Sequence, residues 1–203
     1  FNSKQVYFKK YAHFYHRLLR AFNFIFTQNE SSAQLLSTLQ ITNVQVAGDT
    51  RFDRVYNALQ HTEELPLIAK FKGNELLIVI GSSYAKEEQM LANFLKTCPT
   101  LPYRLIIAPH FINEERLLEI EKIFPTNIIR YSEANATNII NYQSLVIDNI
   151  GMLSKIYKYA DIPFVGGGFK PKGLHNILEA ATFGNAIVFG NEIGYFPEAI
   201  LFR

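Results

Sequence analysis

The chain has 203 residues, of which 48% are hydrophobic and 14% aromatic, and it carries a formal net charge of +2 at pH 7. This composition is typical of a folded globular protein and excludes a disordered chain, and no apolar run approaches the roughly 20 residues of a membrane span. Cys98 is the one cysteine, which excludes an internal disulfide and a cysteine-rich metal site and fits a reducing compartment.

The first 22 residues are basic, with five of the 20 Lys and Arg residues and none of the 18 acidic residues. Apolar residues recur at helical spacing from Tyr7 to Phe22, which predicts an amphipathic helix. Two interpretations stay open, a helix packed on a core with one wet face or a helix on a membrane surface, and we favour the first. Its charge would in either case attract it to anionic lipid.

Strands and helices then alternate. The pattern predicts a strand at 22–28, a helix at 30–40, a strand at 44–49 and a helix at 54–60 that Asp53 caps. The polar stretch 62–75 is the predicted boundary between two domains, 1–60 and 61–203. Because the chain starts without Met and stops at Arg203 inside a helical pattern, we expect a fragment.

The second domain is predicted to be α/β, with a doubly wound, Rossmann-like parallel sheet. Short, continuously apolar strands are what a parallel sheet covered on both faces requires. The predicted strands are 76–82, 104–109, 127–131, 144–150, 162–168 and 186–190, and helices are predicted at 86–97 and 113–124.

Polar and small residues follow these strands, at the edge where doubly wound sheets bind ligands. The strand ends are Gly81-Ser82-Ser83, Pro109-His110, Asp148 to Gly151, and Gly166-Gly167-Gly168. The three glycines allow positive φ and close approach of backbone N–H groups to an anion, and a helix predicted to begin near His175 would add its positive end. A tight turn that needs glycine only for packing is the alternative. Glu179 falls one turn after His175.

Several common nucleotide sites are excluded by spacing. Pro171 occupies the third glycine position of a dinucleotide fingerprint, and the order Lys-Gly in "KGLHN" is the reverse of a P-loop. No Asp-x-Asp pair occurs, so a metal-bridged diphosphate site of that kind is not encoded.

The stretch "FVGGGFKPKGLHNILEAATFGNAIVFG" resembles the donor-binding signature of GT-B glycosyltransferases, and specifically of the 3-deoxy-D-manno-octulosonic acid (Kdo) transferases. Three further stretches, "VAGDTRFD", "GSS" and "DNIGML", are similar to other elements of that family, so the resemblance covers nearly the whole chain. It implies the end of an N-terminal acceptor-side domain, itself a partial second Rossmann-like domain, and most of a C-terminal donor-binding domain.

The resemblance also implies an activity. The family transfers Kdo from CMP-Kdo to a lipid A precursor in lipopolysaccharide synthesis, with inversion and without metal or other cofactor. It implies a full-length protein at the cytoplasmic face of the bacterial inner membrane. The family's general base would lie outside this chain, so we expect donor binding without turnover.

The resemblance assigns roles residue by residue. Backbone and hydroxyl groups at the ends of two strands would face the donor phosphate and Kdo, and His175 and Asn176 would hold the leaving phosphate or sugar carboxylate. Glu179 would bind the ribose, while His110 follows a strand end and could equally cap the next helix. Many members have a His at the position of Tyr84, and many have an Arg between the residues that correspond to Pro109 and His110. That Arg is absent here, so Lys170 or Lys172 would supply its positive charge. The remaining expected donor residues are Gly81, Ser82, Ser83, Gly167, Gly168, and, for the cytosine pocket, Ile150, Gly151 and Met152.

Two other functions stay open. One is a GT-B transferase or nucleotide-sugar epimerase that uses a uridine donor, which fold alone does not exclude. The other is a non-catalytic nucleotide-binding module. Nucleic-acid binding is not expected, because the chain beyond residue 22 is net acidic and carries no aromatic and basic motif of a known module.

Overall fold

The computed structural model describes residues 1–9, 11–60, 63–124, 127–169, 173–194, 196 and 198–201. The chain divides into two units, Phe1–Asn57 and Ala58–Arg203. Each is described by itself. In the described residues no helix is long and apolar enough to cross a membrane.

The first unit is built on two short parallel strands, β1 (Ile25–Thr27) and β2 (Val44–Val46). Helix α2 (Glu30–Ser37) connects them and begins at Asn29, whose side chain accepts a hydrogen bond from the Ser32 N–H at 2.9 Å. The small core of this unit consists of Leu19, Leu36 and Ile41. The other helical segments are η1 (Val6–Phe8), α1 (His13–Arg20) and α3 (Thr50–Gln60), the last of which runs across the division between the units.

The amphipathic helix predicted from Tyr7 to Phe22 is wrong in extent, and only part of this segment, with Tyr7, Phe8 and Leu19, packs on a core. Helix α1 has only eight residues, and of these only Leu19 is buried. Tyr11 and Phe14 are 76% and 73% exposed, so the predicted packing on a core fails for them. The physical reason is the size of the core, which accepts one side chain from this helix.

The prediction that Asp53 caps the helix after the second strand is also wrong. Helix α3 begins at Thr50, and the Asp49 carboxylate accepts a hydrogen bond from the Arg51 N–H at 2.9 Å. Asp49 also pairs with the Arg51 guanidinium, and this hydrogen bond holds the pKa of the Asp49 carboxyl below its usual range. Asp53 lies inside the first turn of the helix, so Asp49 and not Asp53 occupies the capping position.

The second unit contains the predicted doubly wound parallel sheet, with six strands in the order β5-β6-β4-β3-β7-β8. All neighbouring strands are parallel. The chain starts in the middle of the sheet with β3, builds one side, and then returns to β7 on the other side of β3. The strands are β3 (Leu76–Ser83), β4 (Tyr103–Pro109), β5 (Ile128–Arg130), β6 (Ser144–Val146), β7 (Ile162–Val165) and β8 (Val188–Phe189).

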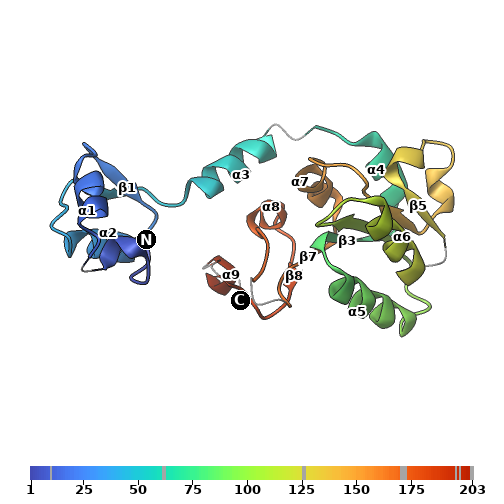
Figure 1. Cartoon of the computed structure of the whole chain (residues 1–203). Helices are drawn as coiled ribbons and strands as arrows, with labels where there is room; N and C mark the ends of the chain where they lie inside the picture. The colour runs from blue at the N-terminus through green and yellow to red at the C-terminus, as the bar shows by residue number, and fades with distance from the viewer. Residues whose placement is uncertain are drawn as a thin grey trace. The chain divides into compact units, whose positions relative to one another are not determined.

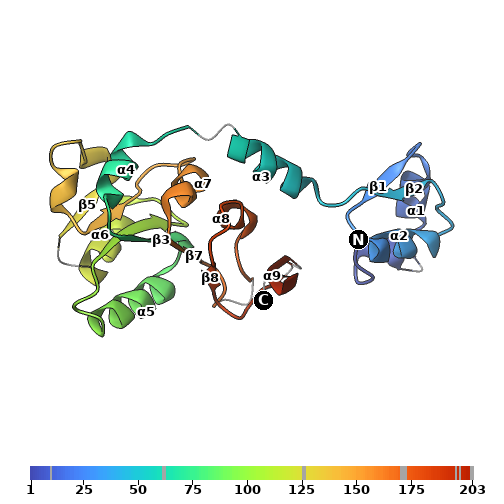
Figure 2. The ribbon, with the colours of Figure 1, turned by 180° about the vertical axis from the view of Figure 1, so that it is seen from behind.

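Helices cover both faces of this sheet (Figures 1 and 2). Ile78 and Ile80 of β3 point to the layer of α5 (Ala85–Lys96) and α6 (Glu114–Ile123), where Leu91 and Leu95 meet them. The alternate residues of β3 face a second core. That core is covered by α4 (Pro66–Lys72), α7 (Leu153–Ile156) and α8 (Leu178–Ala181), and the remaining helical segments are η2 (Tyr131–Glu133), η3 (Ile139–Asn141), η4 (Tyr157–Tyr159) and α9 (Glu198–Leu201).

The stretch 62–75, predicted as a polar boundary, contains a core helix. Ile68 and Phe71 of α4 are fully buried against the sheet, and Pro66 begins the helix. The division between the units falls between Asn57 and Ala58, inside the helix before this stretch. The helix is short and buries only two apolar side chains among polar residues, so the sequence pattern does not distinguish it from a polar linker.

Asp161 ties α4 and the start of β3 together. Its carboxylate accepts hydrogen bonds from Lys72 Nζ at 2.7 Å and from the Leu77 N–H at 2.8 Å. Partial burial raises the pKa of Asp161, but these two hydrogen bonds outweigh it and the pKa lies below its usual value. The carboxylate therefore stabilises the fold at pH values where it is ionised.

We expect Asp161→Asn to lower the free energy of unfolding at pH 7 by about 1 kcal/mol, because the charged acceptor is lost. A depressed pKa in the folded state means that this contribution is present above the unfolded pKa of roughly 3.9 and is lost as the pH falls through the folded pKa. Urea unfolding between pH 7 and pH 3 measures it, with the exposed Glu133→Gln as control. A deficit that stays constant across this pH range would contradict the assignment.

Candidate functional site

The loops after β3, β4 and β7 meet at the carboxyl edge of the sheet. β3 is the first strand of the sheet and β7 the strand at which the winding reverses, so the edge between them is a topological switch point. Gly81 lies opposite Val165 in the β3–β7 register, and its carbonyl accepts a hydrogen bond from the Gly166 N–H at 2.9 Å. The His110 N–H donates to the Ser83 carbonyl at 3.0 Å, which brings in the loop after β4.

Three rings from these three loops form one cluster. The ring centroids of His110 and His175 are 4.4 Å apart and the planes are 27° from parallel. Tyr84 lies 5.0 Å from His110 and 5.6 Å from His175 by ring centroids, and its Oη is 3.1 Å from His175 Nε2. The two histidines that the sequence singled out are therefore adjacent, and Tyr84 joins them.

Tyr84 stays a phenol at neutral pH. Burial raises the pKa of Tyr84, and the negative charge of Glu87 raises it further. A neutral phenol can donate to His175 Nε2 when the imidazole carries its proton on Nδ1. The cluster can thus present an imidazole N–H to an anion at this edge.

A cavity of about 150 Å³ opens beside the ring cluster. It brings together four of the predicted donor residues, Ser82, His110, Ile150 and Gly151. Met152, predicted with them, instead packs against the hydrophobic core. Besides the predicted residues, the wall is formed by Ala108, Pro109, Ile112, Ile147, Asn149 and Leu153.

The glycine run is required by close backbone packing. A Cβ on Gly168 would lie 2.6 Å from the backbone of Gly190, and Gly167 has φ of +92°. The Gly167 N–H donates to Glu87 Oε1 at 2.7 Å, in a fully buried contact. The expectation that this N–H faces a donor phosphate is corrected, because a carboxylate of the protein already accepts it. Of the run, only Gly167 has positive φ.

Two further predicted residues have their groups engaged within the protein. The Ser83 hydroxyl is buried and donates to Glu88 Oε1 at 2.6 Å, and Glu88 also pairs with Arg116. Gly81 faces the hydroxyl of the buried Tyr157. Ser83 and Gly81 therefore build the sheet edge, in contrast to the prediction that they present groups to a ligand.

The helix expected to begin near His175 begins three residues later. Helix α8 starts at Leu178 and has four residues, so it offers little of the predicted helix dipole. Asn176 Oδ1 accepts from the Leu178 N–H at 3.2 Å, and Asn176 Nδ2 donates to Glu179 Oε1 at 3.4 Å. His175 is thus held by the loop, whereas Asn176 shapes the start of the helix and Glu179 stands in its first turn.

Lys170 and Lys172, predicted to replace an absent arginine, lie outside the described residues. Within the described part of the chain, no three His, Cys, Asp or Glu side chains gather as a metal site would need.

Sequence reasoning missed three residues that organise this edge. Tyr84 follows the "GSS" strand end directly, and its place after a strand could have marked it. The buried pair Glu87 and Glu88 resembles the acidic first turn of an ordinary helix, so no local signal separates it from solvated charge. Only the tertiary fold shows their partners.

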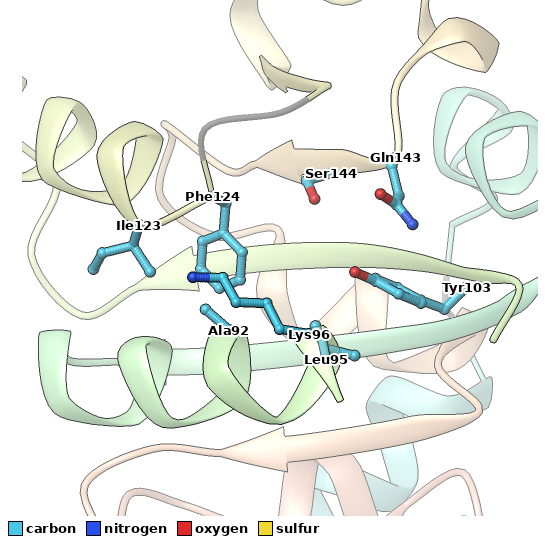
Figure 3. Close-up of a pocket in the computed structure, with 8 residues that line it drawn as sticks. All are labelled: Ala92, Leu95, Lys96, Tyr103, Ile123, Phe124, Gln143 and Ser144. Atoms are coloured by element: carbon cyan, nitrogen blue, oxygen red, sulfur yellow. The ribbon is translucent and has the colours of Figure 1, made fainter. Parts of the chain in front are cut away.

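A second hollow lies at the opposite, amino edge of the same sheet (Figure 3). Its wall comes from α5, the end of α6 and the first residues of β4 and β6. None of the predicted site residues lines it. The lining residues are Ala92, Leu95, Lys96, Tyr103, Ile123, Phe124, Gln143 and Ser144.

Comparison with known proteins agrees with the sequence resemblance. Residues 2–54 match the family described as 3-deoxy-D-manno-octulosonic-acid transferase (kdotransferase). A 3-deoxy-D-manno-octulosonic acid transferase of Rickettsia prowazekii (strain Madrid E) is 27% identical over 187 residues, which cover 91% of this chain and 40% of that protein. The chain resembles the Kdo transferases. It spans less than half of the length of this relative.

Two solved structures share the fold. The C-terminal CMP-Kdo binding domain of WaaA from Acinetobacter baumannii matches with a TM-score of 0.53 and 24% identity, covering 73% of this chain and 75% of that chain. A UDP-GlcNAc 2-epimerase from Neisseria meningitidis matches with a TM-score of 0.63 and 16% identity, covering 99% of this chain and 53% of that chain. The α/β, Rossmann-like fold of GT-B type is thereby confirmed, and it is common to Kdo transferases and an epimerase.

The packing of Gly81 gives a direct test of how this edge is built. A methyl group there would overlap with Tyr157 Oη and approach Leu153 Cδ1 to 2.8 Å. We expect Gly81→Ala to lower the free energy of unfolding by about 1 to 3 kcal/mol through overpacking. Tyr157→Phe in the same chain removes the oxygen and should recover part of this loss, measured as a urea double-mutant cycle. Additive effects of the two substitutions would show that the contact is not as described.

Proposed function

We propose that the chain is the donor-binding part of a Kdo transferase, which transfers Kdo from CMP-Kdo with inversion and without a metal. The observation that carries the proposal is the convergence of Tyr84, His110 and His175 beside the cavity lined by Ile150 and Gly151. This convergence lies at the switch point of the sheet, where the fold places ligands. The similarity to Kdo transferases supports CMP-Kdo as the ligand.

The proposed roles follow from charge development in the reaction. Departure of CMP leaves an oxocarbenium-like sugar and builds negative charge on the phosphate, which fixed donors stabilise most in the transition state. His175, oriented by Tyr84, donates to this phosphate, and His110 lies within ring contact to assist it. Glu179 accepts hydrogen bonds from the ribose. The cytosine lies in the cavity against Ile150 and Gly151.

Binding and deprotonation of the acceptor involve parts of the whole enzyme other than this donor-binding part. Because the chain spans 40% of its Rickettsia relative, we assign the general base for the acceptor hydroxyl to the rest of such a protein. The proposed acceptor is a lipid A precursor at the cytoplasmic face of the inner membrane. Exposed Phe14 and Leu18 together with the nearby Arg17 and Arg20 on α1 support approach to an anionic lipid surface.

Calorimetric titration of the chain with CMP and with UMP, in EDTA, tests the donor assignment. We expect tighter binding of CMP, and at least about tenfold weaker binding in His175→Ala and in Glu179→Ala, because each removes a polar contact to the ligand. His13→Ala, an exposed histidine of the first unit, is the matched control and should leave the affinity unchanged.

Preference for UMP would assign the chain to a uridine-donor relative, the second candidate, which the fold shared with a UDP-GlcNAc 2-epimerase favours. Binding that requires a divalent cation would contradict the metal-free mechanism. Equal affinity of His175→Ala and the unchanged chain would remove the ring cluster from the site.

A further inference from the structure

One buried carboxylate joins the turn after β3 to the glycine-rich loop after β7. Glu87 is 1% exposed. Its Oε1 accepts from the Gly167 N–H at 2.7 Å, and its Oε2 accepts from the Tyr84 N–H at 2.9 Å. Hydrogen bonds to an ionised acceptor are about twice as strong as those between neutral groups, so these two bonds are a strong link between the loops.

The surrounding backbone leaves little room for another arrangement. A Cβ on Gly166 would lie 2.8 Å from Glu87 Oε2, so the loop approaches the carboxylate as closely as a glycine allows. The preceding residue of the same helix, Lys86, places its Nζ 5.8 Å from the centre of the Phe169 ring. The first turn of α5 therefore contacts the glycine-rich loop at two points.

Both N–H groups that Glu87 holds belong to residues in contact with His175. Tyr84 Oη is 3.1 Å from His175 Nε2. A Cβ on Gly167 would lie 2.8 Å from His175 Cδ2, so the glycine also borders the imidazole. Movement of either backbone segment would change the position of the His175 ring.

We propose that Glu87 is a positioning residue that sets His175 for the donor phosphate by fixing Tyr84 on one side and Gly167 on the other. This inference rests on the proposed donor site. Glu87 itself does not touch the donor, because both of its oxygens accept from the protein backbone. It acts through the two segments that it holds.

Glu88→Gln supplies a matched control. Glu88 is the next residue on the same helix and is equally buried, but its partners are Ser83 and Arg116 and not the loop after β7. Both substitutions remove one buried negative charge and keep the side-chain volume. If Glu87→Gln acted only by destabilising the fold through the loss of a buried charge, Glu88→Gln should therefore have the same effect.

The test combines CMP titration with NMR of the isotope-labelled chain carrying Glu87→Gln. A glutamine has a single acceptor oxygen, so one of the two N–H groups must lose its partner. We expect CMP binding to weaken at least about tenfold, with changed Gly167 amide and His175 ring resonances. In Glu88→Gln we expect unchanged CMP affinity and unchanged resonances of these two residues.

Unchanged resonances of His175 in Glu87→Gln would overturn the proposal, and so would an equal loss of CMP affinity in the Glu88→Gln control. If the unsubstituted chain fails to bind CMP, the proposed function fails, and the His175 resonances still decide the positioning role. Slow exchange of the Gly167 amide in the unsubstituted chain supports the buried hydrogen bond, and fast exchange contradicts it.

Discussion

The close approach of backbone between the ends of β3 and β7 is the constraint on which the candidate site depends. These strands are hydrogen-bonded neighbours although 84 residues separate their paired positions, Ile78 with Ile162 and Gly81 with Val165. At the carboxyl edge the pairing continues into the loops through Gly166, where a side chain would meet Glu87. The glycines are there so that two loops and one carboxylate can share this space. Only with that packing in place do the imidazoles come together.

Burial separates the residues of the carboxyl edge into two groups. Gly81, Ser83, Glu87 and Glu88 are buried and make contacts within the protein, whereas His110 and Ile150 are exposed. A buried carboxylate is tolerated because backbone N–H groups or an arginine satisfy its oxygens. The polar residues of the strand ends thus separate into those that build the edge and those that can meet a ligand. Sequence position alone does not distinguish these two sets.

The fold was largely predictable because burial in a parallel sheet leaves a plain pattern. The strands from "LLIVIGS" to "AIVFG" are short and apolar, and all six occur in the structure. Helix α4 was not predicted, since Ile68 and Phe71 are its only fully buried side chains and polar residues flank them. The first helix was overestimated because aromatic periodicity does not reveal whether a core exists to receive it. For the site, the placement of His110 and the glycine-rich loop at one edge of the sheet followed from topology, but the role of Glu87 depends on a contact 80 residues away along the chain.

The most direct test of the donor site is chemical-shift mapping of the labelled chain during titration with CMP. If the carboxyl edge binds the nucleotide, saturable shifts will appear at Ser82, Ile150, Gly151 and His175. The amino-edge hollow, with Lys96 and Ser144, should then remain unchanged (Figure 3). Shifts that cluster at Lys96 and Ser144, or no saturable shift at the four carboxyl-edge residues, would contradict the assignment of the donor site.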